Sequence, residues 1–154
     1  LIGRFGGHAA AAGLSLPAAH LPAFQSAFDA EVRGLLRLED LNGCVWSDGE
    51  LEPADFSLET ADLLREAGPW GQGFLEPLFD GVFEVTAHRI MKEQHLKLWL
   101  RPPGMKQAVE AVAFHRVGDF TPGTTRLRVA YKLDANEWHG ERRLQLRVEH
   151  LEPA

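Results

Sequence analysis

Residues 95–101 read HLKLWLR, and their strict alternation is the most informative pattern in the chain. Successive side chains of an extended chain point to opposite faces, so three leucines lie on one face and Lys97, Trp99 and Arg101 lie on the other. This period of two predicts a β-strand with an apolar core face and a basic, aromatic outer face. Residues 142–150, RRLQLRVEH, repeat the pattern with arginines on the outer face.

Five runs of this kind follow one another in the second half of the chain. They are residues 82–91, 95–101, 108–115, 126–134 and 142–150. The breaks between them carry turn-forming proline and glycine residues. Five short strands separated by such turns predict a small barrel of the OB type rather than a two-sheet sandwich. We therefore expect a five-stranded OB-like β-barrel over residues 79–154.

The first half mixes helical and extended patterns. Apolar residues at a spacing of three and four predict an amphipathic helix over residues 21–35, and Ser57 is suited to cap a second helix. Four alanines at residues 9–12 favour a helical turn, which Gly13 can end. The stretch PWGQGFLEPL at residues 69–78 reads as a rigid connector after Gly68. The expected fold class is therefore α+β, with an α/β part before the barrel.

Charge is distributed unevenly along the 154 residues, whose formal net charge is −6. Residues 1–76 hold 4 basic and 12 acidic residues, whereas residues 77–154 hold 12 basic and 10 acidic residues. The small basic excess of the second half permits a nucleic-acid role, because phosphates respond to the local field of a groove. A composition that is 45% hydrophobic and 25% charged indicates a globular protein and argues against wholesale disorder.

Several classes of protein find no support in the sequence. There is no apolar run of the length that a membrane-spanning helix needs, and no signal peptide is visible at the start. The single cysteine excludes an internal disulfide and a CxxC zinc site. The sequence contains no GxSxG motif of a self-contained hydrolase and no Walker-type motif of a nucleoside triphosphatase. We expect a cytoplasmic protein, and a chain that opens without methionine on a glycine-rich motif is expected to be part of a longer polypeptide.

Four segments carry a resemblance to a known family. Residues 4–13, RFGGHAAAAG, resemble the glycine-glycine-histidine signature of the DHH-associated domain. Residues 69–79 are similar to the connector that precedes the OB domain in the RecJ family of bacterial single-strand-specific DNA exonucleases. Residues 95–97 and 131–138 resemble segments of the same family in the same order. One departure is GFL at residues 73–75, where many members read Gly-Asn-Pro.

The resemblance implies a domain organisation and an activity. It implies the C-terminal part of a DHH-associated domain at residues 1–68, a connector at 69–78 and an OB domain at 79–154. RecJ-like enzymes degrade single-stranded DNA from the 5′ end, in DNA recombination and repair, with Mn2+ or Mg2+ held by a DHH domain. No Asp-His-His sequence occurs here, so we expect no catalytic residue, no metal site and no cofactor in this fragment. Its expected role is to hold the single strand for that missing domain.

The glycine-rich motif gives the first set of candidate binding residues. The resemblance implies that Gly6, Gly7 and His8 grip the nucleotide near the scissile phosphate. Two glycines let a backbone approach a phosphate closely, and their N–H groups at a helix start would face an anion. His8 would add a hydrogen bond, and Arg4 offers a bidentate fork. The alternative is that the glycines only permit a tight turn and that His8 caps a helix.

The basic strand faces give the second set. Lys97, Trp99 and Arg101, joined by Arg143 and Arg147, would form a groove in which cations follow the phosphates and the indole stacks on a base. The alternative is a solvated strand face whose charges keep the sheet edge soluble. A hairpin loop is expected to carry Trp138, Arg142 and Arg143 at its tip. OB domains often use a loop in this position to close over a bound nucleic-acid strand. The alternative for Trp138 is packing against the end of the barrel.

Two functions of different classes remain open at this stage. The first is single-stranded DNA binding by the non-catalytic region of a RecJ-like exonuclease. The second is a protein-interaction module that docks a repair partner and binds little DNA. The resemblance suggests single-strand-binding protein or a recombination helicase as that partner. Binding to a labelled oligonucleotide separates the two, because only the first predicts an affinity that falls steeply with salt.

Overall fold

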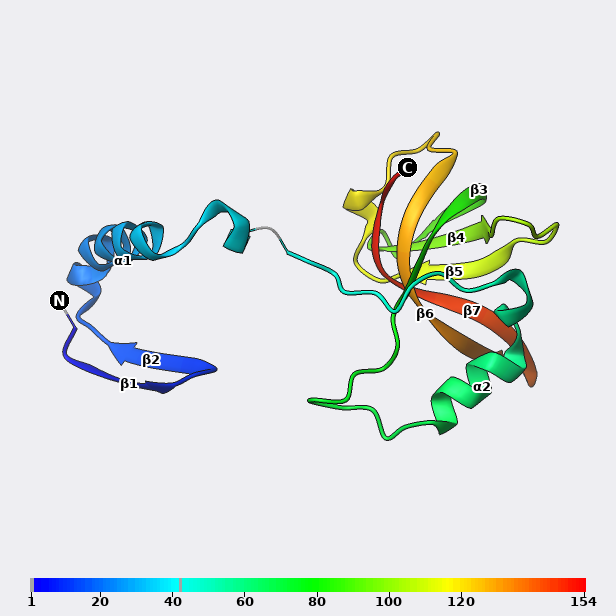
Figure 1. Ribbon diagram of the computed structural model, residues 1–154. Helices are drawn as coiled ribbons and strands as arrows, with labels where there is room; N and C mark the ends of the chain where they lie inside the picture. The colour runs from blue at the N-terminus through cyan, green and yellow to red at the C-terminus, as the bar shows by residue number, and fades with distance from the viewer. Residues whose placement is uncertain (1, 42) are drawn as a thin grey trace. The chain divides into compact units, whose positions relative to one another are not determined.

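The computed structural model describes the backbone of residues 2–41 and 43–154, and their side chains apart from those of residues 38, 39 and 138. Its internal contacts divide the chain into two compact units, Leu1–Cys44 and Val45–Ala154. Figure 1 shows the elements of each unit along the chain. The two units are described separately below.

The first unit consists of a β-hairpin and a helix. Strands β1 (Arg4–His8) and β2 (Ala11–Ser15) pair antiparallel, with Gly7 opposite Ala12. A 3-10 turn, η1 (Ala18–His20), leads into helix α1 (Leu21–Leu35), and a second one, η2 (Leu38–Leu41), follows. No described residue of this unit is buried. The helix expected over residues 21–35 is confirmed, and Pro22 lies in its first turn.

The helical turn expected over residues 9–12 is wrong, since Ala11 and Ala12 belong to strand β2. Residues 9 and 10 form the tight turn between β1 and β2, where the backbone N–H of Ala10 donates to Nδ1 of His8 at 3.2 Å. Four alanines lower the cost of a helix only slightly, and a helix of one turn does not recover its nucleation cost. The cross-strand hydrogen bonds of a hairpin therefore prevail.

The second unit is a barrel with one helix across its end. Its five strands hydrogen-bond in the closed order β3-β4-β5-β7-β6 (Figure 1). All neighbouring pairs are antiparallel except β5 and β7, which run parallel. The strands are β3 (Phe79–Met91), β4 (His95–Arg101), β5 (Val109–Ala113), β6 (Arg126–Trp138) and β7 (Glu141–Pro153). Each of the five runs read from the sequence lies within or overlaps one strand.

The core of this unit confirms the alternation that the sequence predicts. Leu96, Leu98 and Leu100 are fully buried, together with Leu146 of β7. Tyr131 of β6 is also fully buried, with its ring between the rings of three phenylalanines. One face of each strand thus fills the barrel, and the opposite face is left to solvent.

Helix α2 (Leu58–Glu66) lies beside β6 and β7 at one end of the barrel. It begins at Ser57, whose hydroxyl accepts a hydrogen bond from the backbone N–H of Thr60 at 3.1 Å, as the sequence predicts for a cap. Ala61 on its inner side is 3% exposed and belongs to the core. The 3-10 turn η3 (Pro53–Asp55) precedes the helix, and η4 (Val117–Asp119) lies between β5 and β6.

The division between the units falls earlier than the boundary expected at residues 69–78. The segment after Val45 is bonded to the start of β3, because Asp48 donates its N–H to the carbonyl of Leu78 at 2.7 Å and accepts from Leu78 N at 2.9 Å. Asp80 N donates to the carbonyl of Gly49 at 3.1 Å. The expected connector and helix α2 therefore both lie inside the second unit.

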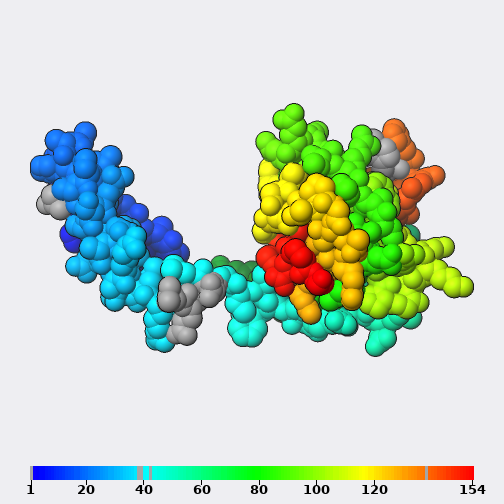
Figure 2. Space-filling view, turned by 90° about the horizontal axis from the view of Figure 1, so that it is seen from above, coloured from blue at the N-terminus to red at the C-terminus, as the bar shows by residue number. Residues whose placement is uncertain are grey.

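The last three residues are exposed, and Figure 2 shows the C-terminal end (red) at the surface of the second unit. In the described part of the chain, no helix has both the length and the apolar character that a bilayer span requires.

Candidate functional site

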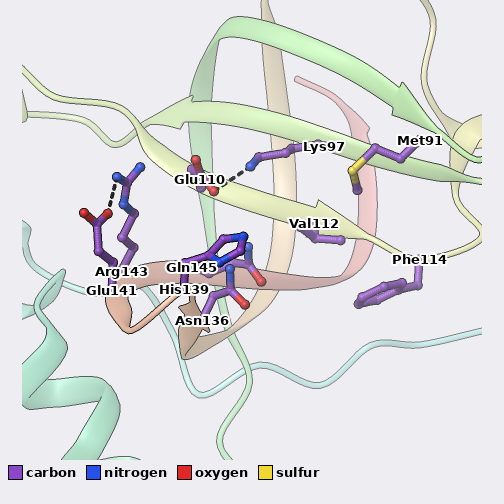
Figure 3. A pocket seen from close by; sticks show the side chains of 10 residues that line it. All are labelled: Met91, Lys97, Glu110, Val112, Phe114, Asn136, His139, Glu141, Arg143 and Gln145. Atoms are coloured by element: carbon purple, nitrogen blue, oxygen red, sulfur yellow. Dashed lines mark hydrogen bonds and ion pairs between the residues drawn. The ribbon is translucent and has the colours of Figure 1, made fainter.

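A groove of about 650 Å³ lies on the outer face of the barrel (Figure 3). It runs over β4, β5 and β7 and is bounded by the hairpin between β6 and β7. The residues that line it are Met91, Lys97, Glu110, Val112, Phe114, Asn136, His139, Glu141, Arg143 and Gln145. We call this feature the barrel groove.

Strand register explains why these side chains share a face. Lys97 of β4 lies opposite Val112 of β5, and Glu110 of β5 lies opposite Gln145 of β7. Neighbouring residues across a sheet point to the same side, and the core faces of these strands are fixed by buried leucines. The outer face must then carry the remaining charged and amide side chains.

Lys97 has two partners on the outer face of the sheet, of which Glu110 lines the barrel groove. Its Nζ lies 2.8 Å from Oε2 of Glu110 and 5.1 Å from the centre of the Trp99 ring. The Lys97 side chain is only 25% exposed, so the indole and the carboxylate are neighbours of a partly desolvated cation. The structure thus brings Lys97 and Trp99 together, as the sequence predicts.

Arginines of β7 extend the basic face. Arg143 lines the barrel groove and pairs with Glu141 at 2.6 Å, with both side chains more than half exposed. Arg147 pairs with Oε2 of Glu76 at 2.9 Å, and Lys132 of β6 reaches the same oxygen at 2.8 Å. A single carboxylate from the expected connector therefore joins two cations on β6 and β7.

Arg101 pairs with a carboxylate of another strand. Its guanidinium forms a fork with the Glu84 carboxylate, with Nε at 3.1 Å and the second nitrogen at 2.5 Å. Glu84 is its direct partner in the register of β3 and β4. Arg101 does not line the barrel groove. Arg101 shares the outer face of β4 with Lys97, but Glu84 holds it outside the lining of the barrel groove.

Arg142 points away from the expected hairpin tip. It donates to Oδ1 of Asp62 on helix α2 at 2.5 Å, and Arg65 reaches the same oxygen at 2.7 Å. The hydrogen bond from Arg142 lowers the pKa of Asp62, against a smaller opposing effect of burial, and the same bond raises the pKa of Arg142. Arg142 and Arg143 both lie at the hairpin end, as expected, but on opposite faces of β7, and Arg142 faces the side that α2 covers.

The backbone of Trp138 ends strand β6, opposite Glu141 at the start of β7. The side chain of Trp138 lies outside the described residues, so neither stacking nor packing is assigned to it. His139 and Gly140 form the hairpin turn with positive φ values of 52° and 80°.

The glycine-histidine motif lies in β1 of the first unit, not at a helix start. A Cβ on Gly7 would lie 2.8 Å from the carbonyl oxygen of Ala11, whereas a Cβ on Gly6 would meet nothing within 4 Å. His8 accepts the turn hydrogen bond through Nδ1, and Arg4 is exposed. The expected anion site at a helix terminus is therefore not formed, and the expected capping of a helix by His8 is also wrong.

Sequence reasoning missed the acidic side of the barrel groove. Glu110 and Glu141 were not predicted as partners of Lys97 and Arg143, although Glu110 occupies an outer position of an alternating run. Neutral side chains at the hairpin end, Asn136 and Gln145, were also outside the predicted set. Within residues 2–41 and 43–154, no group of three or more His, Cys, Asp or Glu residues is arranged to hold a metal ion.

A closed five-stranded barrel with a ligand-sized groove across its central strands defines the OB class of binding domains. The sequence model of one such family, the RecJ OB domain, matches residues 47–150. The chain belongs to this family.

Relatives and solved structures agree with that assignment. The chain is 45% identical over 152 residues to the single-stranded-DNA-specific exonuclease RecJ of Dickeya dadantii, a match that covers 97% of this chain and 26% of the relative. The RecJ protein of Haemophilus influenzae is 43% identical, with 99% and 27% covered. The crystal structure of RecJ in complex with Mg2+ from Thermus thermophilus superimposes with a TM-score of 0.73 at 27% identity, covering 100% of this chain and 23% of that one. The chain thus spans about a quarter of the length of its relatives.

Proposed function

We propose that the chain is the non-catalytic, strand-binding C-terminal region of a RecJ-type exonuclease, and that its barrel groove takes single-stranded DNA. The observation that carries this proposal is the pairing of Lys97 with Trp99 on an open face that Arg143 and Arg147 continue. The metal-dependent chemistry, with Mn2+ or Mg2+, belongs to a DHH domain outside this chain. The first unit, Leu1–Cys44, is then the end of a DHH-associated domain, whose Arg4, Gly6, Gly7 and His8 contact a phosphate from the β1–β2 hairpin.

The chemistry of the barrel groove suits a flexible polyanion. Phosphate oxygens would replace the Glu110 carboxylate on Lys97 and the Glu141 carboxylate on Arg143, so binding exchanges one ion pair for another. A base stacked on the half-buried indole of Trp99 would contribute about 1–3 kcal/mol and requires no particular sequence. The groove therefore favours an unpaired strand, whose bases are free to stack, and reads no base sequence.

The test measures the anisotropy of a labelled oligo-dT with the full 154-residue chain. We expect the double variant Lys97→Glu, Arg143→Glu to lose at least tenfold in affinity, because two phosphate contacts become repulsive. The double variant Arg116→Glu, Arg126→Glu is the matched control, since it makes the same charge change outside the barrel groove. Its affinity should stay within about twofold of the parent chain.

Salt dependence gives the second measurement. Each phosphate contact contributes about −0.7 to the slope of log K against log salt for a single strand. We expect the groove variant to have a shallower slope than the parent chain and the control. Equal affinities in all three chains would refute the groove and would favour docking of a protein, such as single-strand-binding protein or a recombination helicase.

A further inference from the structure

A second pocket, of about 340 Å³, lies at the barrel end where the segment before α2 meets strand β3. It shares no lining residue with the barrel groove. Residues 50–53 and Phe56, residues 80–83, Pro103 with Gly104, and Tyr131 form its walls. We call it the acidic pocket, because Glu50, Glu52 and Asp80 line it.

One buried polar atom in this pocket is left without a partner. The Tyr131 side chain is fully buried, yet its hydroxyl has no hydrogen-bond partner among the described residues. An unsatisfied buried hydroxyl costs about 1–3 kcal/mol, so native structures rarely retain one without a ligand or a bound water. The Tyr131 ring is held in place by the rings of Phe83 and Phe56, whose centres lie 5.4 and 6.1 Å from its own.

The charges around the hydroxyl determine what could meet it. Burial and the neighbouring carboxylates of Asp80, Glu50 and Asp55 raise the pKa of Tyr131, so it stays a neutral phenol. In the part of the chain that the structure describes, Glu50 forms no hydrogen bond or ion pair. Asp80 is held by Ser47 at 2.5 Å and by Arg128 at 3.2 Å. A negative ligand would meet the Glu50 carboxylate, which no cation of the described residues compensates, whereas a cation would be attracted.

We propose that the acidic pocket binds an ammonium group carried on an aliphatic stem. The ammonium would donate to the Tyr131 hydroxyl oxygen and to the Glu50 carboxylate, and its stem would lie against Pro53, Phe56 and Pro103. The pocket volume is at the small end of the range for ligand sites, which fits one lysine side chain or one small diamine. Neither a lysine side chain nor a small diamine takes part in the proposed binding of a DNA strand. This inference therefore does not depend on the proposed function.

The test follows backbone amide shifts of the full, isotope-labelled chain during titration. The probes are cadaverine, Nα-acetyl-lysine-methylamide and the neutral analogue 1-pentanol. We expect saturable shifts at Gly81 and Gly104 with both amines and none with 1-pentanol. Tighter binding of the lysine derivative assigns the pocket to a partner protein, and tighter binding of cadaverine assigns it to a free diamine.

Two variants identify the contacts. Tyr131→Phe removes only the hydroxyl and should weaken amine binding about fivefold, the value of one hydrogen bond. Glu50→Gln, at an exposed position, should weaken it to a similar degree, whereas Glu66→Gln removes the same charge outside the pocket and should leave it unchanged. The proposal is overturned if the amines cause no saturable shift, if 1-pentanol reproduces the shifts, or if both pocket variants bind as the parent chain does.

Discussion

Gly6 and Gly7 are adjacent in β1 but differ in the space that a side chain would find. A Cβ at Gly7 would lie 2.8 Å from both the Ala11 oxygen and the Ala12 Cβ, while at Gly6 nothing lies within 4 Å. The close approach of the two strands therefore requires glycine at only one of the two positions.

We predict that Gly7→Ala destabilises the hairpin of β1 and β2 by about 1–3 kcal/mol, because backbone atoms must move to accept the methyl group. Gly6→Ala is the matched control and should leave the hairpin intact. Amide hydrogen exchange of residues 4–15 measures the effect. Equal exchange in the two variants would contradict the strand register of this unit.

Glu110 is the residue that competes with a phosphate for Lys97. We predict that Glu110→Gln raises the affinity for oligo-dT about two- to fivefold, because the Lys97 ammonium then gives up no ion pair on binding. Glu59→Gln removes a carboxylate from the exposed side of α2 and should leave the affinity unchanged. Anisotropy at one fixed, low salt concentration measures the difference. A decrease with Glu110→Gln would show that the ion pair orients Lys97 for binding.

At the scale of elements, α2 is tied to the barrel by its inner face and by one ion pair. Ala61 is buried against the core, and Asp62 beside it binds Arg142 of β7 at 2.5 Å. Because the pKa of Asp62 is lowered in the folded chain, the ion pair stabilises the fold only where the carboxylate is ionised.

The resulting pH dependence has a definite sign. The contribution is fully present above the ordinary value of 3.8 and is lost as the pH falls through the lowered folded-state pKa. We predict that Asp62→Asn is less stable than the parent chain at neutral pH and that this difference shrinks on acidification below 3.8. Urea unfolding at a series of pH values measures it. A difference that stays constant into acid would assign the effect to packing.

The elements also show where sequence patterns suffice. The alternation in 95–101 predicted both the core leucines and the outer Lys97 and Trp99, because strand period and burial act on the same residues. The position of Arg142 was not predictable in this way. It lies on the core side of β7 beyond the last buried leucine, and a helix far away in sequence supplies its partner. Alternation gives the face of a residue but not what covers that face.

For the whole molecule, the sequence placed the domain boundary too late for a similar reason. Proline and glycine at 69–78 indicate a break, yet Asp48 and Leu78 exchange two hydrogen bonds across 30 positions. Hydrogen bonds between residues so far apart in the sequence produce no local sequence pattern. Sequence patterns alone therefore assign the segment that begins at Val45 to the first half of the chain. Its helix nevertheless packs on the barrel.

The earlier boundary changes the electrostatics of the second unit. Val45–Ala154 contains 13 basic and 18 acidic residues, so the second unit as a whole is acidic. Attraction of a DNA strand must then arise from the field close to the barrel groove. Charges farther away than about 10 Å are screened at 0.1 M salt. The proposed binding therefore depends on local contacts and not on net charge.

Two truncations test this division of the chain. Residues 45–154 keep η3, α2 and every barrel strand, so we predict a free energy of unfolding within about 0.5 kcal/mol of that of the full chain. Residues 69–154, which begin at the boundary that the sequence suggests, lose Ala61 from the core and Leu51, Phe56 and Leu64 from its edge. We predict that this shorter chain is at least about 3 kcal/mol less stable, because four apolar side chains no longer cover the barrel end.

Urea unfolding followed by tryptophan fluorescence measures all three chains, and oligo-dT binding is compared in parallel. If the barrel groove alone holds the DNA strand, residues 45–154 bind oligo-dT as tightly as the full chain does, although they lack β1 and β2. Their affinity should then still depend on Lys97 and Arg143. Equal stability of the chain that begins at residue 69 would instead place the boundary at 69–78 and would leave α2 without a structural role in the barrel.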